Sequence, residues 1–188
     1  MEDLREDVQY TVSLWPEADP ESATRRASWS ALATDASLLT RAGDPAHFTA
    51  SALPMTGDGR EVCLVLHGRM GLWVQPGGHF EPSDHSVVLA AGREMAEETG
   101  LVGRLDPSPL RLSRHRAPCR PGVWHLDLQM LAVCNAAPPV VSDESEEVAW
   151  FDTERLPTGL AGGVADLVEA GRRRLSRSGS PGPPPPGG

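Results

Sequence analysis

The chain contains no lysine, so all 17 basic side chains among its 188 residues are arginines. This absence excludes Schiff-base chemistry on lysine, and it excludes a P-loop, whose lysine contacts nucleotide phosphates. The 26 acidic residues give a formal net charge of −9. Such a charge argues against nucleic acid as a partner, because phosphate backbones are bound by basic surfaces. A phosphorylated small molecule is compatible with it, since a metal ion can supply positive charge.

Cysteines and long hydrophobic runs are also scarce. The three cysteines, Cys63, Cys119 and Cys134, are widely spaced and form no C-x-x-C pair, so we expect neither a zinc site nor a redox motif. Cys63 and Cys134 lie in apolar runs and are predicted to be buried thiols. No apolar run approaches the ~18 residues of a membrane span, and the first residues are acidic and polar, unlike a signal peptide. We therefore expect a cytoplasmic protein without a membrane partner.

The most informative segment reads Arg93-Glu94-Met95-Ala96-Glu97-Glu98-Thr99-Gly100-Leu101. Glu94, Glu97 and Glu98 follow i, i+3, i+4 spacing, which places three carboxylates on one face of a helix. Adjacent like charges destabilise an isolated helix. A divalent cation would offset that repulsion, and Mg²⁺ or Mn²⁺ prefers carboxylate oxygens. The pattern therefore predicts an acidic metal-binding helix.

The other positions of this segment agree with a helix of about 13 residues. Asp84 or Ser86 can cap its start, and Gly100 suits the left-handed residue after its last turn. The side chains predicted to face a core are Val88, Ala91, Met95 and Thr99. A solvent-facing acidic helix without chemistry is the alternative, but it does not explain the preceding double glycine, Arg93 and Gly100 together.

These residues resemble the Nudix box, G-x5-E-x7-R-E-U-x-E-E-x-G-U, where U is bulky and apolar. The second half matches at every fixed position from Arg93 to Leu101. The first half departs from the pattern: Asp84 stands where counting from Gly78 expects Glu, and counting back from Arg93 places His85 there. The box covers about 24 of the 188 residues.

The resemblance implies an α/β fold, an α/β/α sandwich with a mixed sheet. We expect a helical N-terminal extension over residues 1–45, the Nudix hydrolase domain over 46–175 and a disordered Pro/Gly-rich tail over 176–188. Helices are expected over 20–33, where Asp19-Pro20 is a good start, and over 35–42 and 163–176. Strands are expected over 47–55, 61–68, 71–75, 107–116, 124–135 and 147–152.

The implied activity is metal-dependent hydrolysis of a phosphoanhydride bond in a nucleoside diphosphate linked to another group, with Mg²⁺ or Mn²⁺ as cofactor. By resemblance, Glu94 and Glu98 are the best metal ligands and Glu97 is a third. A backbone carbonyl of Gly77 or Gly78 is expected to join them. Arg93 is expected to orient a glutamate without contacting the substrate.

A general base is also needed, and the acidic run before the last strand offers candidates. We favour Glu146 or Glu147 over Glu144, because grouped carboxylates perturb one another's pKa. A solvated acidic loop without a catalytic role is the alternative. The candidate substrate contacts are His79, Asp84 and Trp73.

The remaining histidines have a structural interpretation. His47, His67 and His115 are expected to cap strands or pack at sheet edges. His125 and Asp127 lie two residues apart on one strand, so they share a face. They either reach the site or form a local polar pair, and we favour the pair.

Two other functions stay open: a different reaction in the same family, such as an isomerase, and a Nudix-like nucleotide-binding sensor without turnover. The intact Arg93-Glu94 and Glu97-Glu98 pairs argue against the sensor. ADP-ribose, nucleotide sugars and nucleoside triphosphates all remain candidate substrates. A homodimer through the N-terminal extension is also considered.

Overall fold

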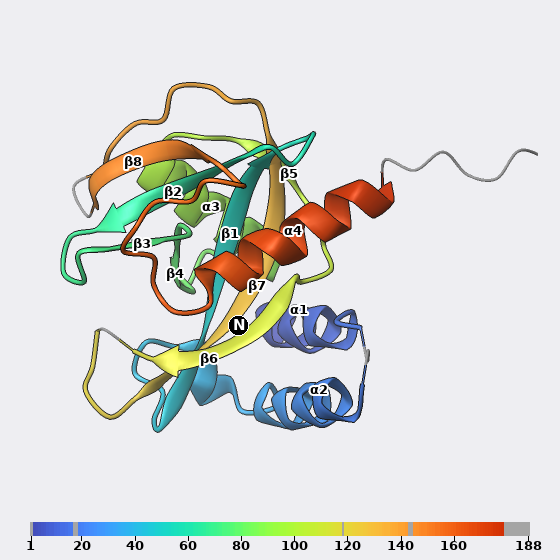
Figure 1. Cartoon of the computed structure of the whole chain (residues 1–188). Coiled ribbons are helices and arrows are strands. Elements are labelled where there is room, and N and C mark those ends of the chain that lie inside the picture. The colour runs from blue at the N-terminus through green and yellow to red at the C-terminus, as the bar shows by residue number, and fades with distance from the viewer. Residues whose placement is uncertain (1, 17–18, 118, 143–144, 179–188) are drawn as a thin grey trace, which may run out of the picture.

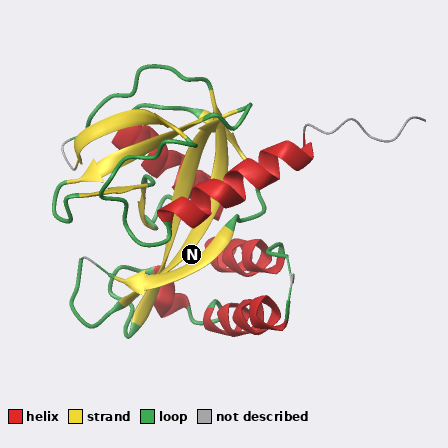
Figure 2. Ribbon diagram, viewed as in Figure 1, coloured by secondary structure: helices red, strands yellow, loops and turns green. Residues whose placement is uncertain are grey.

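The computed structural model describes residues 2–16, 19–117, 119–142 and 145–178 (Figures 1 and 2). The helices are α1 (Glu2–Ser13), α2 (Pro20–Leu32), the short 3₁₀ helix η1 (Ala36–Leu39), α3 (Val87–Thr99) and α4 (Val164–Ser178). The strands are β1 (Ala46–Thr56), β2 (Glu61–His67), β3 (Leu72–Val74), β4 (Gly77–His79), β5 (Gly103–Leu105), β6 (Arg111–Arg116), β7 (Trp124–Cys134) and β8 (Ser145–Asp152).

One mixed sheet joins all eight strands around β1. β1 runs parallel to β7 over its whole length, from the pair Ala46–Trp124 to the pair Thr56–Cys134. It is antiparallel to β2 and to β4. β8 and β3 extend the sheet beyond β2, and β5 and β6 both pair with β7. The predicted mixed sheet is therefore confirmed.

Helices cover both faces of this sheet, with α3 behind it and α4 in front in Figure 1. The core on the α3 side also takes residues from α1 and α2, and its central side chains include Leu4, Phe48, Met95 and Leu128. The core on the α4 side contains Leu53, Leu64, Leu131, Leu167 and Val168. Alternate residues of β1, β2 and β7 supply the two cores, as strand periodicity requires. The predicted α/β/α sandwich is confirmed.

The N-terminal extension is more helical than expected. The prediction of a helix over 20–33 is confirmed by α2, whose N-cap Asp19 forms a capping box with Ser22. The predicted second helix shortens to the four residues of η1. Helix α1 was not predicted, although Leu4, Val8 and Val12 recur at helical spacing and are fully buried. These three side chains pack into the core of their own chain. The homodimer considered through this extension stays a prediction.

The strand predictions are right for the long strands and incomplete for the short ones. β4 and β5 were missed, and each has only three residues. The strand expected over 107–116 is confined to Arg111–Arg116. Helix α4 continues to Ser178, so the first residues assigned to the tail are helical. The rest of that predicted tail, 179–188, lies outside the described residues, within which no helix is long and apolar enough to cross a membrane.

Helix α1 also supports the start of α3. The Asp7 carboxylate accepts a hydrogen bond from the backbone N–H of Val87 at 2.7 Å. That N–H has no partner within its own helix, and negative charge is favourable at this end. We expect Asp7→Ala to lower the free energy of unfolding by about 1 kcal/mol. Chemical denaturation measures this, with Glu6→Ala, exposed on the same helix, as the control that should stay near wild type.

Candidate active site

Helix α3 has the start and the end that the sequence predicts. The Ser86 hydroxyl accepts a hydrogen bond from Leu89 N–H, so Ser86 rather than Asp84 is the N-cap. Gly100 ends the helix in the left-handed conformation, with φ of 69°, and its N–H bonds to Ala96 O. The buried residues are Val87, Ala90, Ala91, Met95 and Thr99, which leaves the acidic face directed away from the core.

Arg93 is the centre of the site and binds four groups. It forms a bidentate contact with Asp84, with Nη2–Oδ2 at 2.9 Å and Nε–Oδ1 at 3.3 Å. Its Nη1 contacts Glu94 Oε1 at 3.0 Å and Glu97 Oε2 at 2.9 Å. Its Nη2 also donates to the carbonyl of His79 at 3.0 Å. One guanidinium therefore fixes two carboxylates of α3 relative to strand β4 and the loop between them.

The carboxylates around Arg93 favour the charged form of its guanidinium. Burial alone would lower the pKa of the guanidinium, but hydrogen bonds and charge from Asp84 and Glu94 outweigh it and raise that pKa. Asp84 is 6% exposed, whereas His85 is exposed. Asp84 also accepts a hydrogen bond from Glu81 N–H at 2.8 Å. Asp84 and His85 are the two candidates for the first glutamate position of the box. Of these two, it is Asp84 that pairs with Arg93.

The three helix glutamates differ in exposure. The Glu94 side chain is 13% exposed, and that of Glu97 is 56% exposed. Glu98 lies between, half-buried. Glu94 lies directly against β4, since a Cβ on Gly78 would lie 2.6 Å from its carboxyl carbon and 2.8 Å from Oε2. The missing side chain of Gly78 therefore leaves the space in which the Glu94 carboxylate lies.

This close approach predicts a contrast between the two glycines of β4. In Gly78→Ala the new methyl meets the mobile end of Glu94, so we expect the fold to persist while the carboxylate moves and activity falls about 100-fold. In Gly77→Ala the methyl meets the backbone of β1, at 2.7 Å from Ser51 Cα, and we expect loss of stability instead. Turnover and thermal unfolding of both variants test this. Equal effects on stability would contradict it.

The candidate bases Glu146 and Glu147 lie at the start of β8 and both are exposed. Leu66 pairs with Glu147 and His67 pairs with Ser145, so Glu146 is the extra residue of a β-bulge. Val148 and Trp150 belong to the core on the α3 side, and Phe151 belongs to the core on the α4 side. Strand alternation counted from Val148 thus assigns Glu147 to the face opposite α3, whereas the bulge interrupts the alternation at Glu146. The remaining residues of the acidic run, Asp143 and Glu144, lie outside the described residues.

Two predicted substrate contacts have other neighbours. Trp73 packs edge-to-face on Phe151, with ring centroids 4.7 Å apart, in the core on the α4 side. The His79 ring lies 3.1 Å from His47, between Nε2 atoms. β4 pairs His79 with Thr49 and Gly78 with Ala50, so the His79 ring and the Glu94 carboxylate lie on opposite faces of the sheet.

The side chains of His125 and Asp127 on β7 have different partners. Asp127 is buried and accepts hydrogen bonds from Thr49 at 3.1 Å and Ser51 at 2.8 Å. His125 contacts Cys119 instead. The favoured His125–Asp127 pair is therefore wrong. The buried network around Asp127 was missed from sequence, although the spacing of Thr49 and Ser51 on one predicted strand could have indicated it.

Comparison with known proteins places this geometry in a family. The model of the NUDIX domain matches residues 45–171. A MutT NUDIX hydrolase from Burkholderia pseudomallei is 25% identical, with a TM-score of 0.55 over 66% of this chain and 97% of that one. The NUDIX domain of NrtR from Shewanella oneidensis, solved with ADP ribose, is 24% identical, with a TM-score of 0.56 over 68% and 87%. An Ap4A hydrolase from C. elegans is 18% identical, with a TM-score of 0.55 over 69% and 98%.

Proposed function

Because this chain belongs to the Nudix hydrolase family, we propose that its α3 carboxylates catalyse hydrolysis of a phosphoanhydride bond in a nucleoside diphosphate linked to another group. The observation that carries the proposal is the Arg93 contact set. A single guanidinium holds Glu94 and Glu97 against β4, with the buried Asp84 behind it. Such preorganised carboxylates suit a cation-assisted reaction and have no use in an ordinary surface helix.

Divalent ions are the general cofactors of this family, and for this chain we propose Mg²⁺ or Mn²⁺. Glu94 and Glu98 would hold the ion, with Glu97 and a carbonyl of Gly77 or Gly78 as further ligands. The donor set is all oxygen, which fits these hard ions. The absence of a Cβ at Gly78, where the Glu94 carboxylate lies, supports the fit. When bound, the ion would neutralise charge on the diphosphate oxygens.

In the proposed reaction, Arg93 keeps Glu94 in place and does not contact the substrate, and Asp84 keeps Arg93 in place. Asp84 is thus reassigned from substrate contact to positioning residue. The oxygen of a water molecule attacks one phosphorus, the bridging P–O bond breaks, and the second phosphate leaves with the bridging oxygen. The proton of the water goes to a carboxylate, for which we propose Glu146, because strand alternation places the other candidate, Glu147, on the face of the sheet opposite α3.

The choice between the two candidate bases gives a prediction. Glu146→Gln keeps size and hydrogen bonding but removes the basic carboxylate, so we expect a fall in kcat of about 10²–10⁴-fold. Glu147→Gln is the matched control and should stay within about threefold of wild type. Steady-state rates of both variants check this. The opposite ranking of the two variants would assign the base to Glu147.

For the substrate, we propose a nucleoside linked through a diphosphate. The two relatives named above with ADP ribose and Ap4A support this class, because both compounds contain adenosine esterified to phosphates that are joined by phosphoanhydride bonds. Trp73 is kept as a candidate contact, although its ring packs on Phe151, whereas the His79 ring lies with His47 on the face of the sheet opposite Glu94 and is no longer proposed as a contact. The predicted cytoplasmic location accords with such a metabolite.

A screen for released nucleoside monophosphate, separated by chromatography, tests the function. ADP-ribose, nucleotide sugars and nucleoside triphosphates are incubated with the protein and Mg²⁺ or Mn²⁺, beside the Glu98→Gln variant. We expect one substrate class to be turned over by wild type and not by the variant. Binding of these compounds without turnover under any condition would overturn hydrolysis and favour the sensor. Conversion without phosphate or nucleotide release would favour an isomerase.

A further inference from the structure

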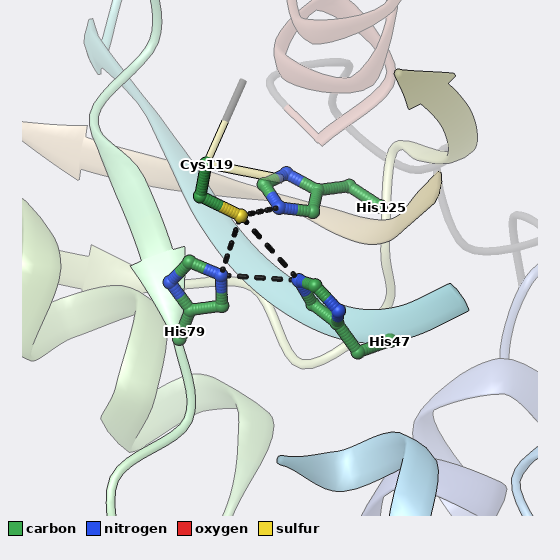
Figure 3. Close-up of side chains that lie close together, drawn as sticks. All are labelled: His47, His79, Cys119 and His125. Atoms are coloured by element: carbon green, nitrogen blue, oxygen red, sulfur yellow. Dashed lines mark hydrogen bonds between the residues drawn. The ribbon is translucent and has the colours of Figure 1, made fainter. Parts of the chain in front are cut away.

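Four donor atoms converge on the opposite side of the sheet from Glu94. They belong to His47, His79, Cys119 and His125, which we call the His₃Cys cluster (Figure 3). All four ligand atoms lie within 4.8 Å of one another. We propose that the His₃Cys cluster is a structural zinc site.

The strand registers explain how distant residues meet. β1 and β7 run parallel, with His47 directly beside His125. β4 pairs with β1 two residues further along, which brings His79 to the same face. Cys119 comes from the loop between β6 and β7 and points into the three rings, as Figure 3 shows.

The distances fit tetrahedral coordination. Cys119 Sγ lies 3.4 Å from His125 Nε2, 3.6 Å from His79 Nε2 and 4.0 Å from His47 Nε2. The two nitrogens of His47 and His79 are 3.1 Å apart. Zinc bound to nitrogen and sulfur at its usual bond lengths gives edges of about 3.3 Å between nitrogens and about 3.6 Å between nitrogen and sulfur. These four distances lie within about 0.5 Å of the expected edges, and the remaining separations, which stay within 4.8 Å, would shorten as the donors close on the ion.

The groups around the cluster orient its donors. The Nδ1 of His47 donates to the Gly43 carbonyl at 3.3 Å, because a carbonyl only accepts. The Nε2 of His47 therefore carries a lone pair and faces the cluster, the arrangement that metal-bound histidines commonly have. Arg120, next to Cys119, donates to the same carbonyl at 2.6 Å and so fastens the cysteine loop to the segment before β1.

Protonation also suits a metal. Burial, with smaller contributions from neighbouring histidines and Arg41, lowers the pKa of His79 to about 4 and that of His125 to about 3. Burial thus favours the neutral form of each ring, which is the form that offers a lone pair to a metal. Hydrogen bonds without a metal are the alternative, but their protons can link these donors only in pairs. A single cation satisfies all of the contacts at once.

The donor set selects the metal and its role. Three imidazoles and one thiolate favour zinc over Mg²⁺ or Mn²⁺, which prefer oxygen. Four protein ligands fill a tetrahedral shell, so the site is structural and leaves no position for substrate. It is separate from the α3 carboxylates, yet His79 links the two, since its carbonyl accepts from Arg93. Zinc would therefore fasten β4, which bears Gly78, to β1, β7 and the cysteine loop.

The sequence argued against zinc because no two cysteines are closely spaced. That expectation rested on the spacing of common zinc motifs. In this fold the ligands come singly from three strands and one loop. Only the tertiary pairing of β1 with β4 and β7 brings them together.

Cysteine reactivity tests the proposal in the intact wild-type protein. Burial raises the pKa of Cys63 to about 12 and that of Cys134 to about 11, whereas Cys119 is half-buried. The full chain is stripped with chelator, dialysed with or without one equivalent of Zn²⁺ in excess Mg²⁺, and alkylated with iodoacetamide. We expect Zn²⁺ to slow modification of Cys119 more than about tenfold, while Mg²⁺ alone has no effect. Equal alkylation rates with and without Zn²⁺ would overturn the site.

Metal content and cobalt spectra provide a second, independent test. Purified protein should hold about one zinc per chain, and Co²⁺ in its place should show the sulfur-to-metal band of a tetrahedral thiolate site. In Cys119→Ser we expect this band to vanish and Zn²⁺ affinity to fall more than about 100-fold, since even loss of an outer-shell partner costs about 10- to 100-fold. His115→Gln is the control, because its exposed ring is 5.3 Å from that of His125 but outside the cluster. A cobalt spectrum without a thiolate band in wild type would contradict the proposal even if Cys119→Ser failed to fold.

Discussion

Replacing Glu94 by glutamine should abolish most turnover while leaving the fold intact. The substitution keeps a side chain of the same size beside Gly78 and a carbonyl that can accept from Arg93, but it removes the negative charge that would bind a divalent ion. We expect kcat/KM to fall about 10³-fold, a loss of about 4 kcal/mol in transition-state stabilisation. Unfolding stability should change by less than about 1 kcal/mol, because one like charge leaves an acidic cluster. Steady-state rates and chemical denaturation measure the two quantities.

A remote glutamate supplies the control for this experiment. Glu169 on α4 contacts Arg172 and Arg173 at the surface, and Glu169→Gln should keep wild-type turnover. The stabilisation that Mg²⁺ or Mn²⁺ gives to wild type in thermal unfolding should also weaken in Glu94→Gln and persist in Glu169→Gln. Turnover of Glu94→Gln within about threefold of wild type would show that this carboxylate holds no essential ion.

Replacing Arg93 by methionine should impair both stability and activity. The variant leaves the Asp84 carboxylate, with a side chain 5% exposed, without its bidentate partner. Loss of one member of a buried ion pair costs about 3–5 kcal/mol, and we expect the lower value because the Arg93 side chain is 19% exposed. The midpoint temperature of thermal unfolding should fall by roughly 6–12 °C for a domain of this length. Activity should fall at least about 100-fold, because Glu94 and Glu97 lose their common anchor.

A second substitution separates the two effects. In the double variant Arg93→Met with Asp84→Asn, the unpaired buried charge is gone, while the amide oxygen can still accept from Glu81 N–H. Stability should recover by about 1–2 kcal/mol, but activity should stay low. The surface pair on α4 gives the control, since Arg173→Met should cost less than about 0.5 kcal/mol. Recovery of activity together with stability would mean that Arg93 matters only for folding.

The α3 helix was the part of the molecule most completely predicted from sequence. Its cap, its glycine stop and its apolar face lie within the 15 residues from Ser86 to Gly100, so local propensity and 3.6-residue periodicity were sufficient. The long strands β1, β2 and β7 were also predicted from local sequence, because each carries a continuous run of buried residues. β4 escaped prediction because three residues with two glycines carry no periodic signal, and α1 escaped because its mean polarity hid three buried positions.

By itself, the sequence determined the acidic helix and the family to which the chain belongs, because both depend on residues close together in the chain. The tertiary structure decided which groups meet across the sheet. It selected Asp84 over His85 as the partner of Arg93, and it assigned Glu147 to the face of the sheet opposite α3. It also brought together the His₃Cys cluster from four separate segments. These outcomes depend on strand register, which long-range pairing fixes and local sequence does not.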